Sequence, residues 1–268
     1  MEQRPGTLAS LFTLAIPVLA GIVYMAASGA PRAYLASNAV ALVLALAWVA
    51  GGRGPCTARQ RRLLASALLA ILALPNLLGP EISGVARWVP LGPVMLHAGM
   101  LALPPLVVLA AREPDDAPPV LLAALLLTLL QPDAAGALAI TFAAVGVHHV
   151  TKDWRMGVVA IAGFVAMLTA AMRGELPPHP FVDRVLVEAA GQSPLAALGL
   201  FLATLAGFLL ILLGPALRPA ERLALAGSLF GFAVMALMSN YPSPLIGHGA
   251  APIIGYGLAL GFRQESRA

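Results

Sequence analysis

Two carboxylates in the longest polar segment of the chain, Asp183 and Glu188, are the residues best placed for acid–base chemistry. They lie in the stretch RGELPPHPFVDRVLVEAAGQSP, residues 173–194. A carboxylate beside an acceptor hydroxyl can remove its proton as the hydroxyl attacks. Five residues along a helix separate two side chains by about 140°, so the two carboxylates would not share one helix face. We predict that one of them is a general base, with ordinary loop or helix-start charges as the alternative.

Two arginines are candidates for holding an anionic group. A guanidinium forks onto phosphate oxygens, so Arg87 is a candidate for binding a phosphate or a sugar, and a structural role is its alternative. Arg184, next to Asp183, is a second candidate cation. Trp88 follows Arg87 directly and is typical of an anchor at the membrane interface, with sugar binding as its alternative.

A third acidic residue, Asp133, lies between long apolar runs in LLTLLQPDAAGALAITF, residues 126–142. Pro132 cannot donate a helix hydrogen bond, so the preceding helix is expected to break here. A carboxylate at such a break can cap the N–H groups of the following helix. We predict this capping role for Asp133, with direct binding of substrate or metal as the alternative.

The histidines do not show the ligand spacing of a metal site. His97, His179 and His248 are all expected on the same side of the membrane as Asp183 and Glu188, so a site could be assembled from them only through the fold. The stretch GHGAAPIIGYG, residues 247–257, lacks the Lys-Ser/Thr of a phosphate-binding loop. We therefore predict no protein metal site.

The composition indicates what kind of fold must position these residues. The chain has 268 residues, of which 60% are hydrophobic and only 10% charged, and its mean hydropathy is +0.89. A soluble domain would carry about 25% charged residues. Long apolar runs recur along the whole chain, which predicts an all-α, polytopic membrane helix bundle. The net charge of +4 is small for a nucleic-acid partner, and the single Cys56 excludes an internal disulfide.

We predict about ten membrane spans in one integral membrane domain, residues 1–268. Several are shorter than the ~20 residues needed to cross the hydrocarbon layer, which implies tilt, local thinning or burial inside the bundle. The expected spans are residues 8–28, 34–50, 63–79, 91–111, 118–131, 134–149, 156–172, 195–214, 223–239 and 250–262.

Basic residues set the expected orientation. Placing both termini in the cytoplasm puts twelve of the sixteen basic residues on the inside, as the positive-inside rule requires. The inside residues are then Arg4, Arg53, Arg59, Arg61, Arg62, Arg112, Lys152, Arg155, Arg218, Arg222, Arg263 and Arg267. The outside keeps the carboxylates discussed above, together with the Pro/Gly-rich loop NYPSPLIGHGAAP, residues 240–252. Ionisable groups and irregular backbone therefore coincide on the outer side, where function is expected.

Three outer stretches together resemble signatures of the SEDS family, the shape, elongation, division and sporulation proteins that include RodA and FtsW. They are GPEISGVARWVPLGP (residues 79–93), LLQPDAAGALA (residues 129–139) and PSPLIGHGAAPIIGYGLALG (residues 242–261). The matching positions are Gly84, Arg87, Trp88, Leu91 and Gly92 in the first stretch, Gln131, Pro132 and Asp133 in the second, and Pro242, Pro244, Ile246 and Gly249 in the third. Their order and the ten-span topology also agree with that family, so the chain resembles a shortened and divergent member.

The resemblance implies a membrane glycosyltransferase of cell-envelope assembly. Such proteins polymerise lipid II, a polyprenyl-pyrophosphate-linked glycan, into peptidoglycan strands during cell elongation or division, in the bacterial inner membrane and beside a class B penicillin-binding protein. When His179 is matched to the family's loop motif, Phe181 falls where the acidic residue belongs, Asp183 lies two residues later, and Glu188 approximates the next acidic position. His248 stands where the family has Tyr.

We therefore predict Asp183 or Glu188 as the catalytic base. The predicted substrate-binding residues are Arg87, Trp88, Asp133, His179, Arg184 and His248. A divalent cation, Mg²⁺ or Mn²⁺, is left open as a cofactor because a metal can also stabilise a departing pyrophosphate. The partners expected are the polyprenyl-linked precursor, membrane lipids and a class B penicillin-binding protein. Two alternatives stay open: a non-catalytic relative that binds the precursor or serves as a scaffold, and a transporter or lipid flippase.

Overall fold

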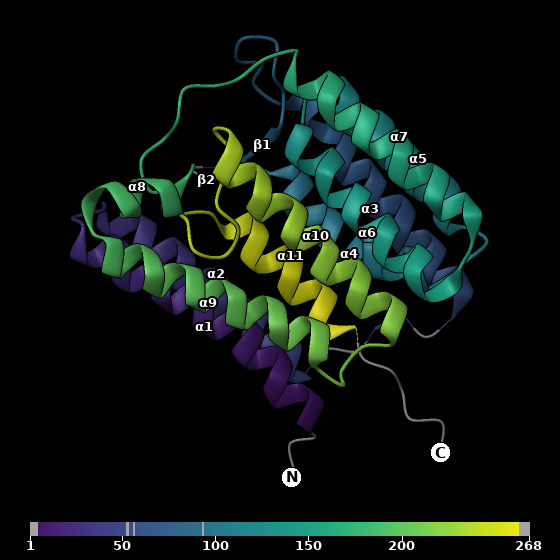
Figure 1. Ribbon diagram of the computed structural model, residues 1–268, viewed down its shortest axis with the longest axis horizontal. Coiled ribbons are helices and arrows are strands. Elements are labelled where there is room, and N and C mark those ends of the chain that lie inside the picture. The colour runs from purple at the N-terminus through teal and green to yellow at the C-terminus, as the bar shows by residue number, and fades with distance from the viewer. Residues whose placement is uncertain (1–4, 52–53, 56, 93, 263–268) are drawn as a thin grey trace.

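The computed structural model describes residues 5–51, 54–55, 57–92 and 94–262, and these form eleven α-helices and one β-hairpin (Figure 1). The helices of the first half are α1 (Pro5–Ala27), α2 (Arg32–Gly51), α3 (Ala58–Leu78), α4 (Ala98–Arg112), α5 (Ala117–Leu130) and α6 (Ala134–Thr151). The helices of the second half are α7 (Trp154–Ala171), α8 (Val185–Gln192), α9 (Pro194–Leu213), α10 (Pro219–Met238) and α11 (Ala250–Gly261). Strands β1 (Trp88–Leu91) and β2 (Val94–His97) pair antiparallel, with Trp88 opposite His97.

The predicted all-α membrane fold is confirmed. Seven of the described helices are long and apolar enough to cross a membrane, and α4, α5 and α11 are shorter apolar helices. All ten overlap the segments expected from the sequence. The remaining helix, α8, has eight residues and lies in the outer segment 173–194, which the sequence left without an assigned structure.

One predicted boundary was wrong. The fourth span was expected to begin at residue 91, but residues 94–97 form β2 and the helix begins only at Ala98. The cause is local, because Gly92 adopts a φ of +59° and the chain turns back on β1 there. His97 then caps α4, its Nδ1 accepting a hydrogen bond from the Met100 N–H at 3.3 Å.

Small residues let the central helices approach closely. A Cβ built on Gly231 of α10 would lie 2.6 Å from the Ala139 Cα of α6, and one on Gly227 would lie 2.4 Å from the Phe142 carbonyl. Without an aqueous phase between them, membrane helices gain stability from this kind of close packing. The α6–α10 pair is therefore the most closely packed part of the bundle, and α4 packs against both helices.

The apolar interior has two parts. A large cluster extends through α1 to α7 and α9 to α11. A smaller one joins Tyr24 and Met25 of α1 to Val185 and Ala189 of α8, Leu200 of α9 and Ile246. Helices α1, α2, α8 and α9 lie along one side of the molecule, and α5 and α7 lie along the other (Figure 1).

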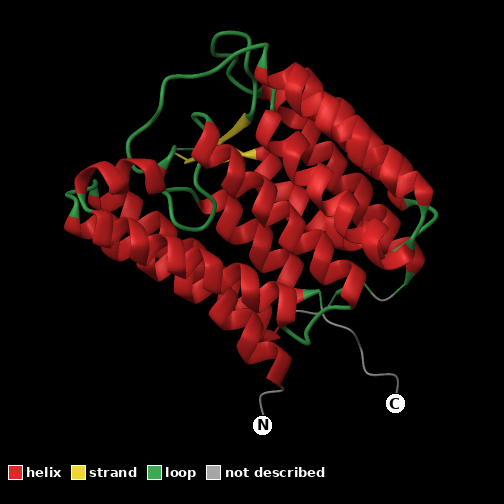
Figure 2. Cartoon of the chain, viewed as in Figure 1, coloured by secondary structure: helices red, strands yellow, loops and turns green. Residues whose placement is uncertain are grey.

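Charged residues mark one end of the bundle, called here the inner end after the predicted orientation. The start of α1 approaches the α9–α10 connection, where a Cβ on Gly6 would lie 3.2 Å from the Ala216 Cα, and the end of α11 contacts Arg112. Four of the twelve expected inside residues, Arg4, Arg53, Arg263 and Arg267, lie outside the described residues. At the opposite, outer end the long non-helical segments gather (Figure 2).

Candidate functional site

The three family-like stretches and the acidic loop meet at the outer end. The hairpin contacts the α5–α6 break through Arg87, and both contact the segment between α10 and α11. We call residues 241–249 the strap and residues 179–184 the acidic turn. The strap lies between the buried polar groups of the hairpin and the acidic turn. Contacts between residues 45 to 154 positions apart in sequence thus form one site.

Arg87 is the central cation of this site, and it is buried, with only 2% of its surface exposed. Its Nη2 donates a hydrogen bond to the Pro132 carbonyl, and its guanidinium lies 4.5 Å from the centre of the Tyr241 ring. Its Nε has no hydrogen-bond partner among the described residues. The guanidinium of Arg87 therefore lies beneath the strap, without direct access to the surface.

Asp133 is completely buried and caps α6, as predicted, with Oδ1 accepting a hydrogen bond from the Gly136 N–H at 3.0 Å. Its other oxygen, Oδ2, has no partner among the described residues. Two glycines leave the space for that oxygen, because a Cβ would lie 2.8 Å from it on Gly99 and 2.6 Å from it on Gly136. The ring of His97 lies beside the same space, 3.3 Å from the Gly99 Cβ position.

Tyr241, which sequence reasoning missed, connects the break to the strap. Its hydroxyl accepts a hydrogen bond from the Ala134 N–H at 3.0 Å, so it caps α6 beside Asp133. Its ring covers Arg87, and its carbonyl accepts from the Arg184 N–H at 3.2 Å. The signal was present in the sequence, because an aromatic residue directly precedes the Pro-Ser-Pro of the third family-like stretch.

The strap holds the acidic turn by backbone pairing. The Ser243 N–H donates to the Val182 carbonyl at 2.9 Å, and the His248 N–H donates to the Phe181 carbonyl at 2.6 Å. The Ser243 hydroxyl in addition accepts from the Val185 N–H at 2.9 Å. Asp183 itself forms an isolated β-bridge with Pro242.

Asp183 is partly buried in the acidic turn, and its Oδ2 accepts a hydrogen bond from the His179 N–H at 2.8 Å. Burial raises the pKa of its carboxyl, and the His179 backbone bond and the charges of His179 and Arg87 offset part of that rise. Asp183 and Arg87 therefore lie on the same side of the molecule and within electrostatic reach. A carboxyl with a raised pKa is better matched to accepting a proton than an ordinary aspartate.

Glu188 lies in the first turn of α8, where its Oε2 accepts from the Phe181 N–H at 3.3 Å. The two candidate bases thus both bond to the backbone of the acidic turn, Asp183 from within it and Glu188 from the following helix. Arg184 occupies the N-cap position of α8 in the left-handed region, with φ of +51°, and its side chain makes no capping hydrogen bond. Its buried Nε has no hydrogen-bond partner among the described residues.

The remaining candidates lie around this centre. Trp88 is half-buried in β1 and meets the His97 ring edge-on at 5.9 Å. His179 is exposed in the acidic turn. His248 stacks on Tyr34 of α2 with 3.7 Å between ring centres and contacts the Ser37 hydroxyl at 3.3 Å. Burial lowers the pKa of His248, which favours its neutral form.

The described residues do not offer a metal site. No group of three or more His, Cys, Asp or Glu side chains among them is arranged to hold an ion. His97 ends β2 with its ring against Trp88, His248 lies on Tyr34, and His179 is in the acidic turn, so the three do not converge.

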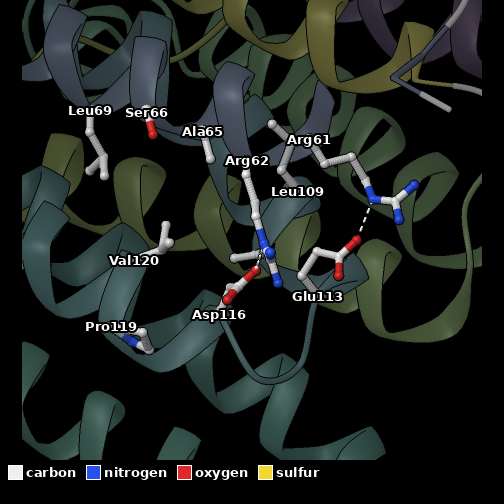
Figure 3. Close-up of a pocket in the computed structure, with 11 residues that line it drawn as sticks. Arg61, Arg62, Ala65, Ser66, Leu69, Leu109, Glu113, Asp116, Pro119 and Val120 are labelled. Carbon is white, nitrogen blue, oxygen red and sulfur yellow. Dashed lines mark hydrogen bonds and ion pairs between the residues drawn. The ribbon is translucent and has the colours of Figure 1, made fainter. Parts of the chain in front are cut away.

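A cavity of about 260 Å³ lies at the inner end, away from this site (Figure 3). It lies between α3, the end of α4 and the start of α5. Its arginines face carboxylates: Arg61 pairs with Glu113, and Arg62 pairs with Asp116 at 2.7 Å. The cavity and its ion pairs therefore belong to the inner end and form no part of the outer site.

Comparison with solved structures places this arrangement in a known fold. No family model matches the sequence, and no curated protein matches it either. A crystal structure of the rod shape determining protein RodA of Thermus thermophilus is 27% identical, with a TM-score of 0.65, over 94% of this chain and 93% of that chain. The chain has a SEDS-like fold.

Two further structures support that assignment. An alanine-for-aspartate variant of the same Thermus RodA is 26% identical, with a TM-score of 0.65, over 94% of both chains. A chain of a peptidoglycan synthase complex, described as coordinating polymerization and crosslinking, is 25% identical with a TM-score of 0.61, over 94% of this chain and 95% of that one. The SEDS-like chain is thus a multi-pass membrane protein whose fold extends over nearly the whole length of its neighbours.

Proposed function

We propose that this SEDS-like protein is a membrane glycosyltransferase that acts on a polyprenyl-pyrophosphate-linked glycan of the lipid II type. The observation that carries the proposal is the convergence of the three family-like stretches beside Asp183, whose pKa is raised by burial. The similarity to RodA and to a peptidoglycan synthase complex supports a role in peptidoglycan assembly. The proposed location is the bacterial inner membrane.

The proposed step is attack by an acceptor sugar hydroxyl on the anomeric carbon of the donor. Asp183 takes the hydroxyl proton as the new carbon–oxygen bond forms. The bond from the anomeric carbon to the pyrophosphate oxygen breaks, and its electron pair leaves with the polyprenyl pyrophosphate. Positive charge near the departing pyrophosphate stabilises this step. Arg184, beside Asp183, is proposed to contact the pyrophosphate.

Arg87 is proposed to act from beneath the strap. Its guanidinium is only 2% exposed, so in this conformation it stabilises negative charge through its field rather than by a direct bond. Direct contact with a phosphate would require Tyr241 to move off it.

The other candidates are proposed to act around Asp183. Glu188 is proposed to stabilise the acidic turn, and Trp88, His179 and His248 are proposed to contact the sugars as they enter the site. Asp133 supports the site by fixing the start of α6. Direct binding of substrate by Asp133 stays a prediction.

A partner of the class B penicillin-binding type is proposed from the peptidoglycan synthase complex among the structural neighbours. Crosslinking chemistry would then lie in the partner and polymerisation in this chain.

The non-catalytic alternative has one specific observation in its favour. The Asp183 carboxylate already accepts a backbone hydrogen bond, and Arg87 is covered by Tyr241. A protein that binds the lipid precursor without reacting would need neither group free. The two functions differ in whether product forms.

The test is polymerisation of fluorescent lipid II by the purified protein in detergent or liposomes. We expect wild type to form glycan strands and Asp183→Ala and Asp183→Asn to lose roughly 100-fold or more of that rate. Asp183→Asn retains an oxygen that can accept from the His179 N–H, so folding should be preserved. Asp115→Asn at the inner end, whose side chain is 96% exposed, is the matched control.

Full activity in both Asp183 variants would remove the base assignment. Precursor binding without product in wild type, with the partner protein present, would favour the non-catalytic function instead.

A further inference from the structure

Asn38 is a completely buried amide within the apolar helix α2. A buried amide is unfavourable unless its hydrogen bonds are made, and a polar residue inside a membrane helix is often functional. Both ends of this amide are used. Its Nδ2 donates to the Gly247 carbonyl at 2.9 Å, and its Oδ1 accepts from the Gly249 N–H at 3.0 Å. Asn38 thus hydrogen-bonds to the strap backbone on both sides of His248.

The segment that Asn38 bonds to is the one that pairs with the acidic turn. The His248 N–H donates to the Phe181 carbonyl at 2.6 Å, and Ser243 pairs with Val182 at 2.9 Å. Two hydrogen-bonded steps therefore connect the Asn38 amide to the backbone on which Asp183 is placed. No other side chain among the described residues bonds to the strap backbone on both sides of one residue.

The turn and the strap need such support because their backbone is strained. Phe181, Arg184 and Leu245 have φ of +63°, +51° and +66°, although none is glycine. Left-handed conformations of this kind are costly for bulky residues and persist only where surrounding contacts impose them. Phe181 and Arg184 bracket Asp183, and Leu245 lies in the strap, so the strain is concentrated where Asp183 is positioned.

Helix α1 closes the other side of the strap. A Cβ on Gly21 would lie 2.2 Å from the Ile246 carbonyl oxygen, so α1 and the strap are in backbone contact there. The strap is therefore enclosed by the two N-terminal helices, and Asn38 supplies its polar attachment.

We propose that Asn38 is a positioning residue that fixes Asp183 in its working geometry by anchoring the strap. The expected effect on the rate rests on the proposed function. The expected effect on the position of the acidic turn rests on the hydrogen bonds alone. Small displacements of a catalytic group cost roughly 100-fold in rate, so loss of the anchor is expected to have an effect of that order. The proposed role of Asn38 involves no contact with substrate, because both ends of its amide bond to the strap.

The first test compares pH–rate profiles of wild type, Asn38→Ala and Asn38→Asp in the lipid II assay. Without the anchor the acidic turn relaxes and Asp183 becomes more hydrated, while the charged groups that face it, His179 and Arg87, are unchanged. We expect Asn38→Ala to lose roughly 100-fold in rate and its acid limb to move to lower pH. Asn76→Ala, at an exposed position of α3, is the matched control and should behave as wild type.

The Asn38→Asp variant adds a rescue. A protonated carboxyl can supply the one donor and the one acceptor that the amide uses here, whereas the ionised form cannot donate to the Gly247 carbonyl. Its relative rate compared with Asn38→Ala should therefore be highest at acidic pH. A rate that falls only with the amount of folded protein, with no change in the pH profile, would show that Asn38 is merely structural.

The second test is independent of activity. Nitroxide labels are placed at Leu78 at the end of α3 and at Pro180 in the acidic turn, both exposed, after Cys56 is replaced by Ser. We expect a narrow distance distribution in the otherwise unaltered protein and in Asn76→Ala, and a broad or shifted one in Asn38→Ala. Identical distributions in all three would overturn the proposal. If wild type forms no product, the proposed function fails, and the label distances still decide whether Asn38 fixes the turn.

Discussion

Two buried arginines at opposite ends of the bundle are held in different ways. Arg112 at the inner end pairs with the buried Glu221, with Nε and Nη2 each 3.2 Å from a carboxylate oxygen. It also donates to the Phe262 carbonyl. Arg87 at the outer end has a carbonyl and an aromatic ring as its partners, and no carboxylate of the described residues lies within ion-pair distance.

The same contrast extends to the surrounding charges. Inner-end arginines pair with acids, as Arg155 does with Asp153 at 2.9 Å. The Arg155 side chain donates hydrogen bonds to the Asp153 carboxylate, and these lower the pKa of Asp153. At the outer end, burial instead raises the pKa of Asp183. Ion pairs with carboxylates hold the inner-end arginines in place, whereas Arg87 lies under the Tyr241 ring without such a pair among the described residues. The difference teaches that ion pairs hold the inner end together, whereas the outer end, where we propose that the chemistry takes place, holds its central cation without one.

Breaking the inner ion pair is expected to have the largest effect on stability. Glu221→Ala leaves Arg112 buried without its counter-ion, which should lower the free energy of unfolding by about 3–5 kcal/mol. Replacing both partners by Met should cost much less, because no charge is then left unpaired. Thermal unfolding in detergent measures both. Equal losses in the single and double variants would contradict the pairing.

Filling the space around Asp133 comes next. In Gly136→Ala the new Cβ would meet the Asp133 carboxylate and the Thr128 methyl, so overpacking should cost about 1–3 kcal/mol. Gly199→Ala in α9, where no atom lies within 4 Å of the added Cβ, is the matched control. It should be neutral or slightly stabilising. If both variants unfold at the same temperature, the carboxylate does not fill the space as described.

A conservative change at the outer arginine should have a smaller effect on stability. Arg87→Lys keeps the charge but loses the planar group over Tyr241, for an expected loss of about 1–2 kcal/mol. Polymerisation should fall by more than the unfolded fraction explains, because the field at Asp183 changes as well. The same exchange at Arg62, an exposed inner-end arginine, should leave both quantities unchanged.

The smallest expected effects are those of pH on the polymerisation rate and on the free energy of unfolding. Asp183 acts as a base only when ionised, so the rate should rise with pH through a pKa above the ordinary aspartate value of about 4. A carboxyl whose folded-state pKa is raised contributes stability at acidic pH and loses it as pH rises through that pKa. Asp183→Asn should therefore flatten the stability–pH curve in this window. The lowered pKa of Asp153 gives the opposite trend, because stability falls as the pH decreases through that pKa. Asp153→Asn should remove this trend.

Much of the fold could be read from the sequence, because apolar length alone specifies membrane helices. The break at Pro132 and the cap by Asp133 were also predictable, since proline removes a donor and a short carboxylate supplies an acceptor. The hairpin was missed because β1 and β2 span only four residues each and lie inside an apolar run. Asn38 could have been noticed as the lone amide in an apolar helix, but nothing in the sequence names its partner 209 residues away.

The sequence by itself determined the number of apolar segments, the position of the breaks and the chemical types gathered on the outer side. Those properties are local, since hydropathy, proline and capping act over a few residues. Tertiary structure decided that Arg87 is buried beneath Tyr241, that Glu221 neutralises Arg112 and that Asp183 is held by a strap anchored at Asn38. These depend on contacts between residues more than 50 positions apart, and only packing sets such distances and their electrostatic consequences.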